Sequence, residues 1–164
     1  MLSMPLLLAL LAQITPVQPI VKGTGLPPAD SEESQVMAPI NAWFAGIDAG
    51  NAQAIAAQLR LEGGGGATVA AVRADGTRTV RHLTWQEYLA GVKPGGPRLH
   101  ERFTGQPAIE IDQDIAMVWG DFTLTVDGKV ATCGVDHFDL IRENGAWKVQ
   151  NVTWSQRTTG CDAS

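Results

Sequence analysis

The sequence has little positive charge, and the apolar run near its start is short. Its 164 residues contain 12 Lys and Arg against 17 Asp and Glu, which gives a formal net charge of −5. A nucleic-acid partner is disfavoured because phosphates need cations, and an anionic membrane surface is disfavoured for the same reason. The apolar run over residues 4–12 is too short to span a bilayer.

Motifs for metals, cofactors and nucleophiles are also missing. The histidines His82, His100 and His137 lack metal-ligand spacing, and the sequence contains no CxxC motif. It also contains no GxSxG motif, and the glycines at 63–66 are not followed by the Lys-Ser or Lys-Thr of a phosphate loop. The sequence therefore predicts no metal site and no cofactor.

The start of the chain reads differently from the rest. Residues 1–19 are interpreted as a signal-peptide region, because the Leu-rich run at 4–12 is followed by small and polar residues. No Lys or Arg precedes Lys22, so a disordered or helical extension is the alternative. Prolines at 16, 19, 27 and 28 indicate a linker over 20–29, and 30–161 form one domain. We expect an exported protein, periplasmic or secreted.

Helix signals lie in the first half of the domain. Apolar residues recur at helical spacing from Val36 to Ile47, and Asp30 with Glu33 can form a capping box in front of them. A second helix is predicted from Asn51 and a third from Thr84, since each of these side chains can cap a helix N-terminus.

The rest of the domain has the pattern of strands joined by tight turns. The pairs Asp75-Gly76, Asp127-Gly128 and Asn144-Gly145 are strong hairpin signals. Strands are predicted over 67–73, 77–83, 98–104, 114–126, 129–142 and 146–156. Helices followed by a long antiparallel meander predict the α+β class, with N-terminal helices packed on one face of a curved, mostly antiparallel sheet.

The turns set a provisional register for the last three strands. With Val126 opposite Lys129, Trp119 falls opposite Asp136, and the next hairpin places Asp136 opposite Thr153. One face then carries Ile115, Met117, Trp119, Asp121, Asp136, Phe138, Leu140, Trp147, Val149, Asn151 and Thr153. The other carries Val118, Phe122, Leu124, Cys133, Val135, His137, Val152 and Trp154. A β-bulge would shift this register and mix the two faces.

The second face is nearly as apolar as the first. A single layer of helices can cover only one face of a sheet, and large exposed apolar patches are rare on monomers. The sequence therefore predicts a homodimer packed through the outer sheet face.

The end of the domain resembles a known family. The stretch 133–142, Cys-Gly-Val-Asp-His-Phe-Asp-Leu-Ile-Arg, is followed by Asn144-Gly145 and by Trp147-Lys148-Val149. It is similar to the C-terminal hairpin of nuclear transport factor 2-like proteins, above all a secreted bacterial group labelled lumazine-binding or polyketide cyclase-like. The resemblance covers about 30–161 and implies a cone-shaped fold closed by a long helix over a pocket. The fold hosts isomerases, dehydratases, cyclases and binders, so the lumazine label identifies no ligand.

Two carboxylates are catalytic candidates, because the resemblance implies a pocket carboxylate that acts as acid or base. Asp136 lies at the boundary of the apolar and polar parts of its face, where burial would raise its pKa. Alternatively, it hydrogen-bonds Asn151, Thr153 or the backbone and orders the sheet. Glu101 alternates with Leu99 and Phe103, so it either pairs with Asp136 or forms a salt bridge at the rim.

Candidate ligand-binding residues come from the same face and from the helices. They are Trp43, Tyr88, Trp119, Asp121, Phe138 and Asn151, and the aromatic residues can equally be plain core. A disulfide bond between Cys133 and Cys161 is a further hypothesis: Cys133 falls opposite Gln156, so a chain that turns back there brings the two sulfurs together.

Three functions remain open on this sequence. The leading one is binding of a small, largely apolar molecule in the cone pocket. The second is an acid–base enzyme of isomerase, dehydratase or cyclase type that uses Asp136. The third is a non-catalytic interaction module whose pocket is filled by side chains.

Overall fold

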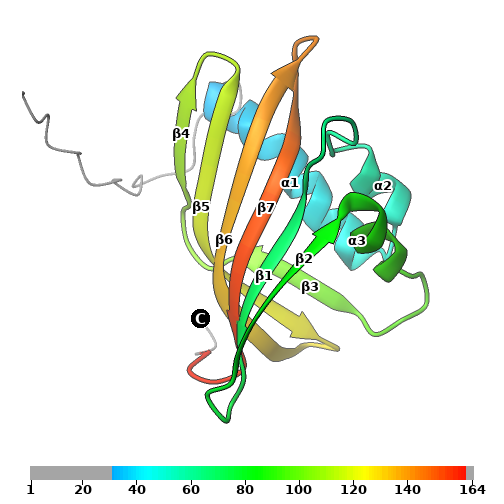
Figure 1. Cartoon of the computed structure of the whole chain (residues 1–164), viewed down its shortest axis with the longest axis vertical. Coiled ribbons are helices and arrows are strands. Elements are labelled where there is room, and N and C mark those ends of the chain that lie inside the picture. Colours follow the sequence, from blue (N-terminus) through cyan, green and yellow to red (C-terminus); the bar gives the residue numbers. More distant parts are fainter. Residues whose placement is uncertain (1–30, 162–164) are drawn as a thin grey trace, which may run out of the picture.

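A computed structural model of the chain describes residues 31–161. The predicted signal-peptide region and linker, together with Asp30, lie outside the described residues. Helices pack against one face of a curved sheet, which confirms the predicted α+β class (Figure 1). Within 31–161, no helix is long and apolar enough to cross a membrane.

The three helices begin at polar caps. Helix α1 (Glu32–Asp48) is capped by Ser31, whose side chain accepts a hydrogen bond from the backbone N–H of Ser34, so the capping residue is not the predicted Asp30. Helix α2 (Ala52–Ala56) is capped by Asn51 as predicted. Helix α3 (Trp85–Gly91) has the predicted capping box of Thr84 and Glu87.

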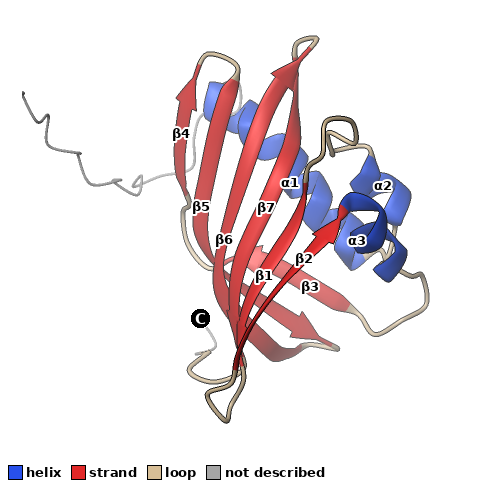
Figure 2. Ribbon diagram, viewed as in Figure 1, coloured by secondary structure: helices blue, strands red, loops and turns tan. Residues whose placement is uncertain are grey.

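Seven strands form the sheet in the order β2-β1-β7-β6-β5-β3, and β4 also pairs with β5. Their bounds are β1 Gly66–Val72, β2 Arg78–Thr84, β3 Leu99–Phe103, β4 Ala108–Asp112, β5 Ile115–Val126, β6 Lys129–Glu143 and β7 Ala146–Arg157. The meander β5-β6-β7 is antiparallel as predicted, whereas the parallel pairing of β1 with β7 and the strand β4 were not predicted. Figure 2 shows the strands as one twisted layer with the helices on one side.

Two β-bulges change the predicted register. Val126 does lie opposite Lys129, but a bulge at Leu124/Thr125 places Trp119 opposite His137 instead of Asp136. A second bulge, at Asp139/Leu140, places Asp136 opposite Trp154 instead of Thr153. The predicted faces are therefore wrong over much of β5 and β7, since a shift by one residue exchanges the two sides of a strand.

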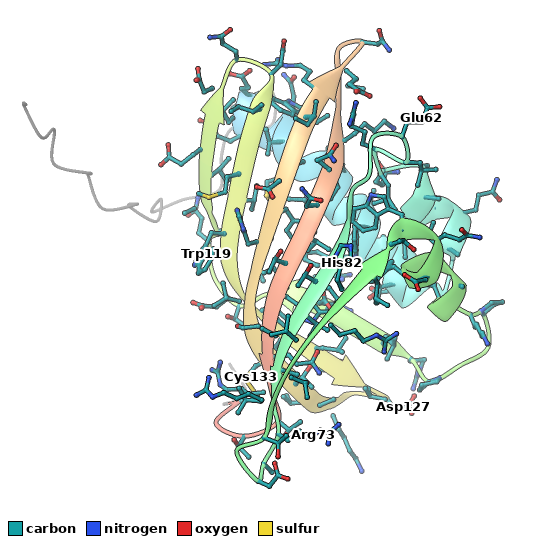
Figure 3. All side chains as sticks on the ribbon, in the orientation of Figure 1. Glu62, Arg73, His82, Trp119, Asp127 and Cys133 are labelled. Atoms are coloured by element: carbon teal, nitrogen blue, oxygen red, sulfur yellow. A yellow bond between two sulfur atoms is a disulfide. The ribbon has the colours of Figure 1, made fainter. Side chains whose placement is uncertain are left out.

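The corrected inner face packs against α1. Its buried residues on β5, β6 and β7 include Ala116, Val118, Phe122, Asp136, Phe138, Leu140, Val149 and Val152. The α1 residues buried against this face belong to the predicted apolar stripe, with Ile40, Trp43 and Phe44 at its centre. The outer face carries Trp119, which is 44 % exposed and projects from β5 (Figure 3).

A disulfide bond joins Cys133 on β6 to Cys161 in the C-terminal tail, as the sequence predicted. Cys133 lies opposite Arg157, one residue from the predicted partner. The bond attaches the tail to the end of the sheet near the C-terminus (Figure 3).

Candidate functional site

A pocket of about 770 Å³ opens between the ends of α1 and α3 and the strands β2, β3, β5 and β7. Its wall is largely apolar, with contributions from Ile47, Leu83, Val92, Leu99, Leu124 and Trp154. Sites for small molecules typically have volumes of about 300–1,000 Å³ and walls of this character. The cavity therefore has the size and lining of a small-molecule site.

Two of the polar side chains that line the pocket, Tyr88 and Glu101, come from different elements. Tyr88 comes from α3, whose start is fixed by the capping box. Glu101 comes from β3, where it pairs with Leu124 on β5. Leu99, which alternates with Glu101, also lines the pocket, so the predicted inward direction of Glu101 is confirmed.

Asp136 lies deeper, beneath the pocket wall. It is 2 % exposed, and its register neighbours are Gly120 on β5 and Trp154 on β7. One carboxyl oxygen, Oδ2, is buried with no hydrogen-bond partner among the described residues. An unpartnered buried carboxyl oxygen is costly, because it loses its water without replacement.

A missing side chain opposite Asp136, at Gly120, makes room for the ring of Phe103. A Cβ on Gly120 would come within 2.6 Å of the Phe103 ring, so the ring occupies the space in front of Gly120. Phe103 in turn packs edge-to-face against Phe44 and Phe138, at centroid distances of 5.3 and 6.3 Å. Aromatic rings therefore wall off this part of the inner face from water.

Burial and mutual repulsion act on both carboxyl groups. Burial raises the pKa of Asp136 to about 9, and the nearby charge of Glu101 adds to the rise. Burial also raises the pKa of Glu101 to about 7, although the Arg102 guanidinium opposes the rise and the Asp48 carboxylate adds to it. Near neutral pH the Asp136 carboxyl is therefore protonated, and the Glu101 carboxyl is close to its midpoint of ionisation. Two carboxyl groups that interact in a desolvated site are expected to lose their protons in separate steps.

The Tyr88 hydroxyl belongs to the same electrostatic group. Burial raises the pKa of Tyr88, and the charges of Glu101 and Asp136 raise it further. Tyr88 is thus a neutral hydrogen-bond donor at any physiological pH. Its hydroxyl can donate to an acceptor on a bound molecule, and the Glu101 carboxylate, which also lines the pocket, can accept a proton when it is ionised.

The other predicted aromatic contacts form the support behind this group. Trp43 is 2 % exposed and packs against Trp85, Tyr88 and Phe138 at centroid distances of 5.7, 5.1 and 5.6 Å. Phe138 is 1 % exposed. Neither lines the pocket, so their place is the core that holds Tyr88, as the alternative interpretation allowed.

Three predicted ligand-binding residues lie away from the pocket. Trp119 is on the outer face, with its ring centroid 5.7 Å from that of His137. Asp121 is exposed on the same face, opposite Val135. Asn151 accepts a hydrogen bond from the backbone N–H of Gly66 at 3.3 Å, which ties β7 to β1. The predicted hydrogen bonds of Asp136 to Asn151 and Thr153 are wrong, because Asp136 lies on the inner face of the sheet, whereas Asn151 and Thr153 lie on the outer face.

Sequence reasoning missed Leu124, Trp154 and the loop over 92–98. Leu124 and Trp154 were assigned to the outer face, since the two bulges leave no mark in the pattern of apolar residues. The loop carries a Pro- and Gly-rich sequence that signals a turn but not its place at a pocket. Among the described residues, no cluster of His, Cys, Asp and Glu could hold a metal ion.

No protein-family model matches the sequence, and no curated protein matches it. Several solved structures do match it, and they belong to one class of cone-shaped α+β proteins. A nuclear transport factor 2-like superfamily protein from Salmonella enterica is 15 % identical with a TM-score of 0.56, over 80 % of this chain and 95 % of that one.

A second NTF2-like protein, from Cytophaga hutchinsonii, is 12 % identical with a TM-score of 0.57, over 76 % and 98 % of the two chains. A protein of unknown function from Mycobacterium tuberculosis is 19 % identical with a TM-score of 0.59, over 76 % and 71 %. The chain therefore has the nuclear transport factor 2-like fold, as its C-terminal hairpin suggested.

Proposed function

We propose that this protein binds a small, largely apolar molecule in the cone pocket. The observation that supports the proposal is the open volume of about 770 Å³ between Tyr88, Leu124 and Trp154. The predicted alternative of a pocket filled by side chains is less well supported, because Trp43 and Phe138 lie in the core behind the cavity and Trp119 lies on the outer face.

Filling the pocket tests the proposal. Leu99→Trp adds bulk to the pocket wall, whereas Leu61→Trp makes the same change at a side chain that is 55 % exposed. Native mass spectrometry after incubation with the neutral apolar probe N-phenyl-1-naphthylamine is expected to give one adduct per chain for wild type and Leu61→Trp. Leu99→Trp should give none. Equal adduct formation by all three proteins would contradict the proposal.

A second candidate function is acid–base catalysis on the bound molecule. The unpartnered Oδ2 atom of Asp136 and the raised pKa values of Asp136 and Glu101 favour it. Such a pair can hold one group as acid and the other as base near neutral pH. Asp136→Asn then abolishes turnover of a substrate while the neutral probe still binds; a loss of both would point to a structural role.

We also propose a homodimer through the outer sheet face. The corrected outer face supports it with Ile115, Met117, Trp119 and Val135, of which Ile115 is 55 % and Trp119 44 % exposed. It is more polar than predicted, because Phe122, Leu124, Val152 and Trp154 turn inward.

Export to the periplasm or beyond is a further part of the proposal. The disulfide bond between Cys133 and Cys161 supports it, since such bonds persist in oxidising compartments. The membership in a secreted lumazine-binding or polyketide cyclase-like group remains a prediction from the sequence. Thiol counting on the denatured, non-reduced protein from its native source should find no reactive thiol, and two thiols would contradict export to such a compartment.

A further inference from the structure

Basic side chains surround the mouth of the pocket, although the chain as a whole carries a net charge of −5. Lys93 and Arg98 belong to the loop between α3 and β3, and Arg81 belongs to β2. All three are exposed and line the pocket. The cations are therefore concentrated where a ligand would enter.

Arg81 is tied to the interior by the sheet register. It pairs with Val69, which pairs with Trp154, which pairs with Asp136. Residues in one such row stand on the same face of a sheet. The row therefore runs from an exposed cation at the mouth, past the Trp154 wall, to a buried carboxyl group.

These cations are available to a ligand. Elsewhere in the fold, Arg60 pairs with Glu143 at 2.5 Å and Arg142 pairs with Glu32 at 2.6 Å. Over residues 31–161, by contrast, neither Lys93 nor Arg98 makes an ion pair. In the same loop, a Cβ on Gly95 would meet no atom within 4 Å, so the space beside Gly95 is open.

The acidic groups at the same mouth are already engaged. Asp48 is bound by Arg102 at 2.6 Å and by His100 at 3.1 Å. The Glu87 carboxylate accepts hydrogen bonds from the backbone N–H and the hydroxyl of Thr84, both at 2.8 Å. Arg102 thus balances the charge of Asp48, whereas Glu87 keeps its negative charge near Arg81, so Lys93 and Arg98 are the cations left for an entering molecule.

The interior of the pocket, unlike its mouth, disfavours a negative charge. Glu101 lines the wall and Asp136 lies behind it, and no basic residue lines the pocket beyond its mouth within the described part of the chain. A negative group placed at that depth would be desolvated, and the Glu101 carboxylate would repel it when ionised. An anionic ligand can therefore enter in one direction only, with its apolar body inside and its charge at the mouth.

We propose that the ligand is an amphipathic organic anion, whose single acidic head is held by Lys93 and Arg98 with help from Arg81. Its apolar body lies against Leu99, Leu124 and Trp154. The proposal rests on the proposed small-molecule binding at the same pocket and adds the chemical class of the ligand.

Two probes with one aromatic skeleton distinguish small-molecule binding in general from a preference for an anionic head. N-phenyl-1-naphthylamine is neutral, and 1-anilinonaphthalene-8-sulfonate is the same molecule with a sulfonate. Two exposed ion pairs should make the wild-type protein bind the anion roughly tenfold more tightly than the neutral probe at low salt. Screening should remove most of this preference at about 0.5 M salt.

The variants locate the effect. The double variant Lys93→Gln/Arg98→Gln is expected to lose the preference for the anion and to keep its affinity for the neutral probe. The matched control Arg73→Gln/Lys129→Gln removes the same charge at exposed positions outside the pocket lining and should keep the preference. Leu99→Trp should bind neither probe, which would place both in the pocket.

The outcomes are distinguishable. Equal binding of the two probes by wild type, or an undiminished preference in Lys93→Gln/Arg98→Gln, overturns the anionic head and leaves small-molecule binding intact. Failure of wild type to bind either probe overturns both. A carboxylate head and a sulfonate or phosphate head are separated by competition with dodecanoate and dodecyl phosphate, and displacement by either one supports the proposal.

Discussion

Asp136 is the residue whose chemistry depends most on its surroundings. The Phe103 ring, Trp154 and the core enclose it, and its Oδ2 atom has no partner over residues 31–161. A carboxyl group in such a place is stable only when it is protonated or paired with a cation. The energetic cost of keeping it suggests a role other than stability.

The first prediction concerns the pH dependence of unfolding. The pKa of Asp136 is raised from 3.8 to about 9, so the folded protein binds a proton that the unfolded chain releases over this range. Stability should therefore fall as the pH rises from about 4 to 9. Asp136→Asn should weaken this dependence and be more stable than wild type at pH 8 by at least about 1 kcal/mol.

Urea unfolding at pH 5 and pH 8 checks this. Asp112→Asn, at an exposed position on β4, is the matched control and should retain the wild-type pH dependence. An Asp136→Asn variant whose stability changes with pH as steeply as that of wild type would show that the carboxyl is ionised in the folded protein.

The second prediction concerns Gly120, whose missing side chain makes room for the Phe103 ring. Gly120→Ala would bring a Cβ within 2.6 Å of that ring, so the packing between β3 and β5 must shift. We expect a loss of about 1–3 kcal/mol in unfolding free energy. Thermal melting of both variants checks this. The Cβ added by the control Gly105→Ala would meet no atom within 4 Å, so its melting temperature should stay close to that of wild type. Equal melting temperatures for both variants would disprove the close packing.

At the scale of elements, the turns and caps could be read from the sequence because their signals are local. Asp127 and Asn144 have φ values of 51° and 52°, as the tight hairpin turns require. Asn51 and the Thr84–Glu87 pair cap the helices that they were predicted to cap. Each of these features depends on residues within four positions of one another.

The pocket wall could not be read in the same way. The bulges at Leu124/Thr125 and Asp139/Leu140 each add one residue to one strand, and the faces exchange beyond them. The inward direction of Asp136 and Glu101 was predicted correctly because they lie on β6 and β3, where the alternation held. Trp119 and Trp154 exchanged faces, since both faces of β5 and β7 carry apolar side chains that hide the shift.

The third prediction concerns the link between β6 and the C-terminal tail. The disulfide bond closes a loop with a sequence separation of 28 residues, and loop-closure entropy assigns such a bond about 3.6 kcal/mol. Cys133→Ser/Cys161→Ser should lose about this much unfolding free energy in urea and retain probe binding, because neither residue lines the pocket. An unchanged unfolding midpoint under non-reducing conditions would contradict it.

At the scale of the whole molecule, the two faces of the sheet have separate tasks. The inner face builds the core and the pocket, and the outer face carries Ile115, Met117, Trp119 and Val135. None of these four residues lines the pocket, so a dimer packed through them would leave the pocket lining uncovered.

The fourth prediction follows from this separation. Trp119→Asp should shift the protein from dimer to monomer in analytical ultracentrifugation at micromolar concentration, because it places a charge in the apolar part of the interface. Val80→Asp, on the edge strand β2 at a side chain that is 76 % exposed, should leave the dimer intact. A monomeric wild-type protein would exclude the dimer outright, and probe binding should survive in either state.

The central claim is that the space between Tyr88, Leu124 and Trp154 is an open ligand site. A crystal structure of the full chain grown with N-phenyl-1-naphthylamine tests it most directly. We predict the probe inside the cone, against Leu99 and Trp154, with its amine within hydrogen-bond reach of Glu101 or Tyr88. A cavity closed by these same side chains, with the probe absent or lying on the outer face beside Trp119, would contradict it.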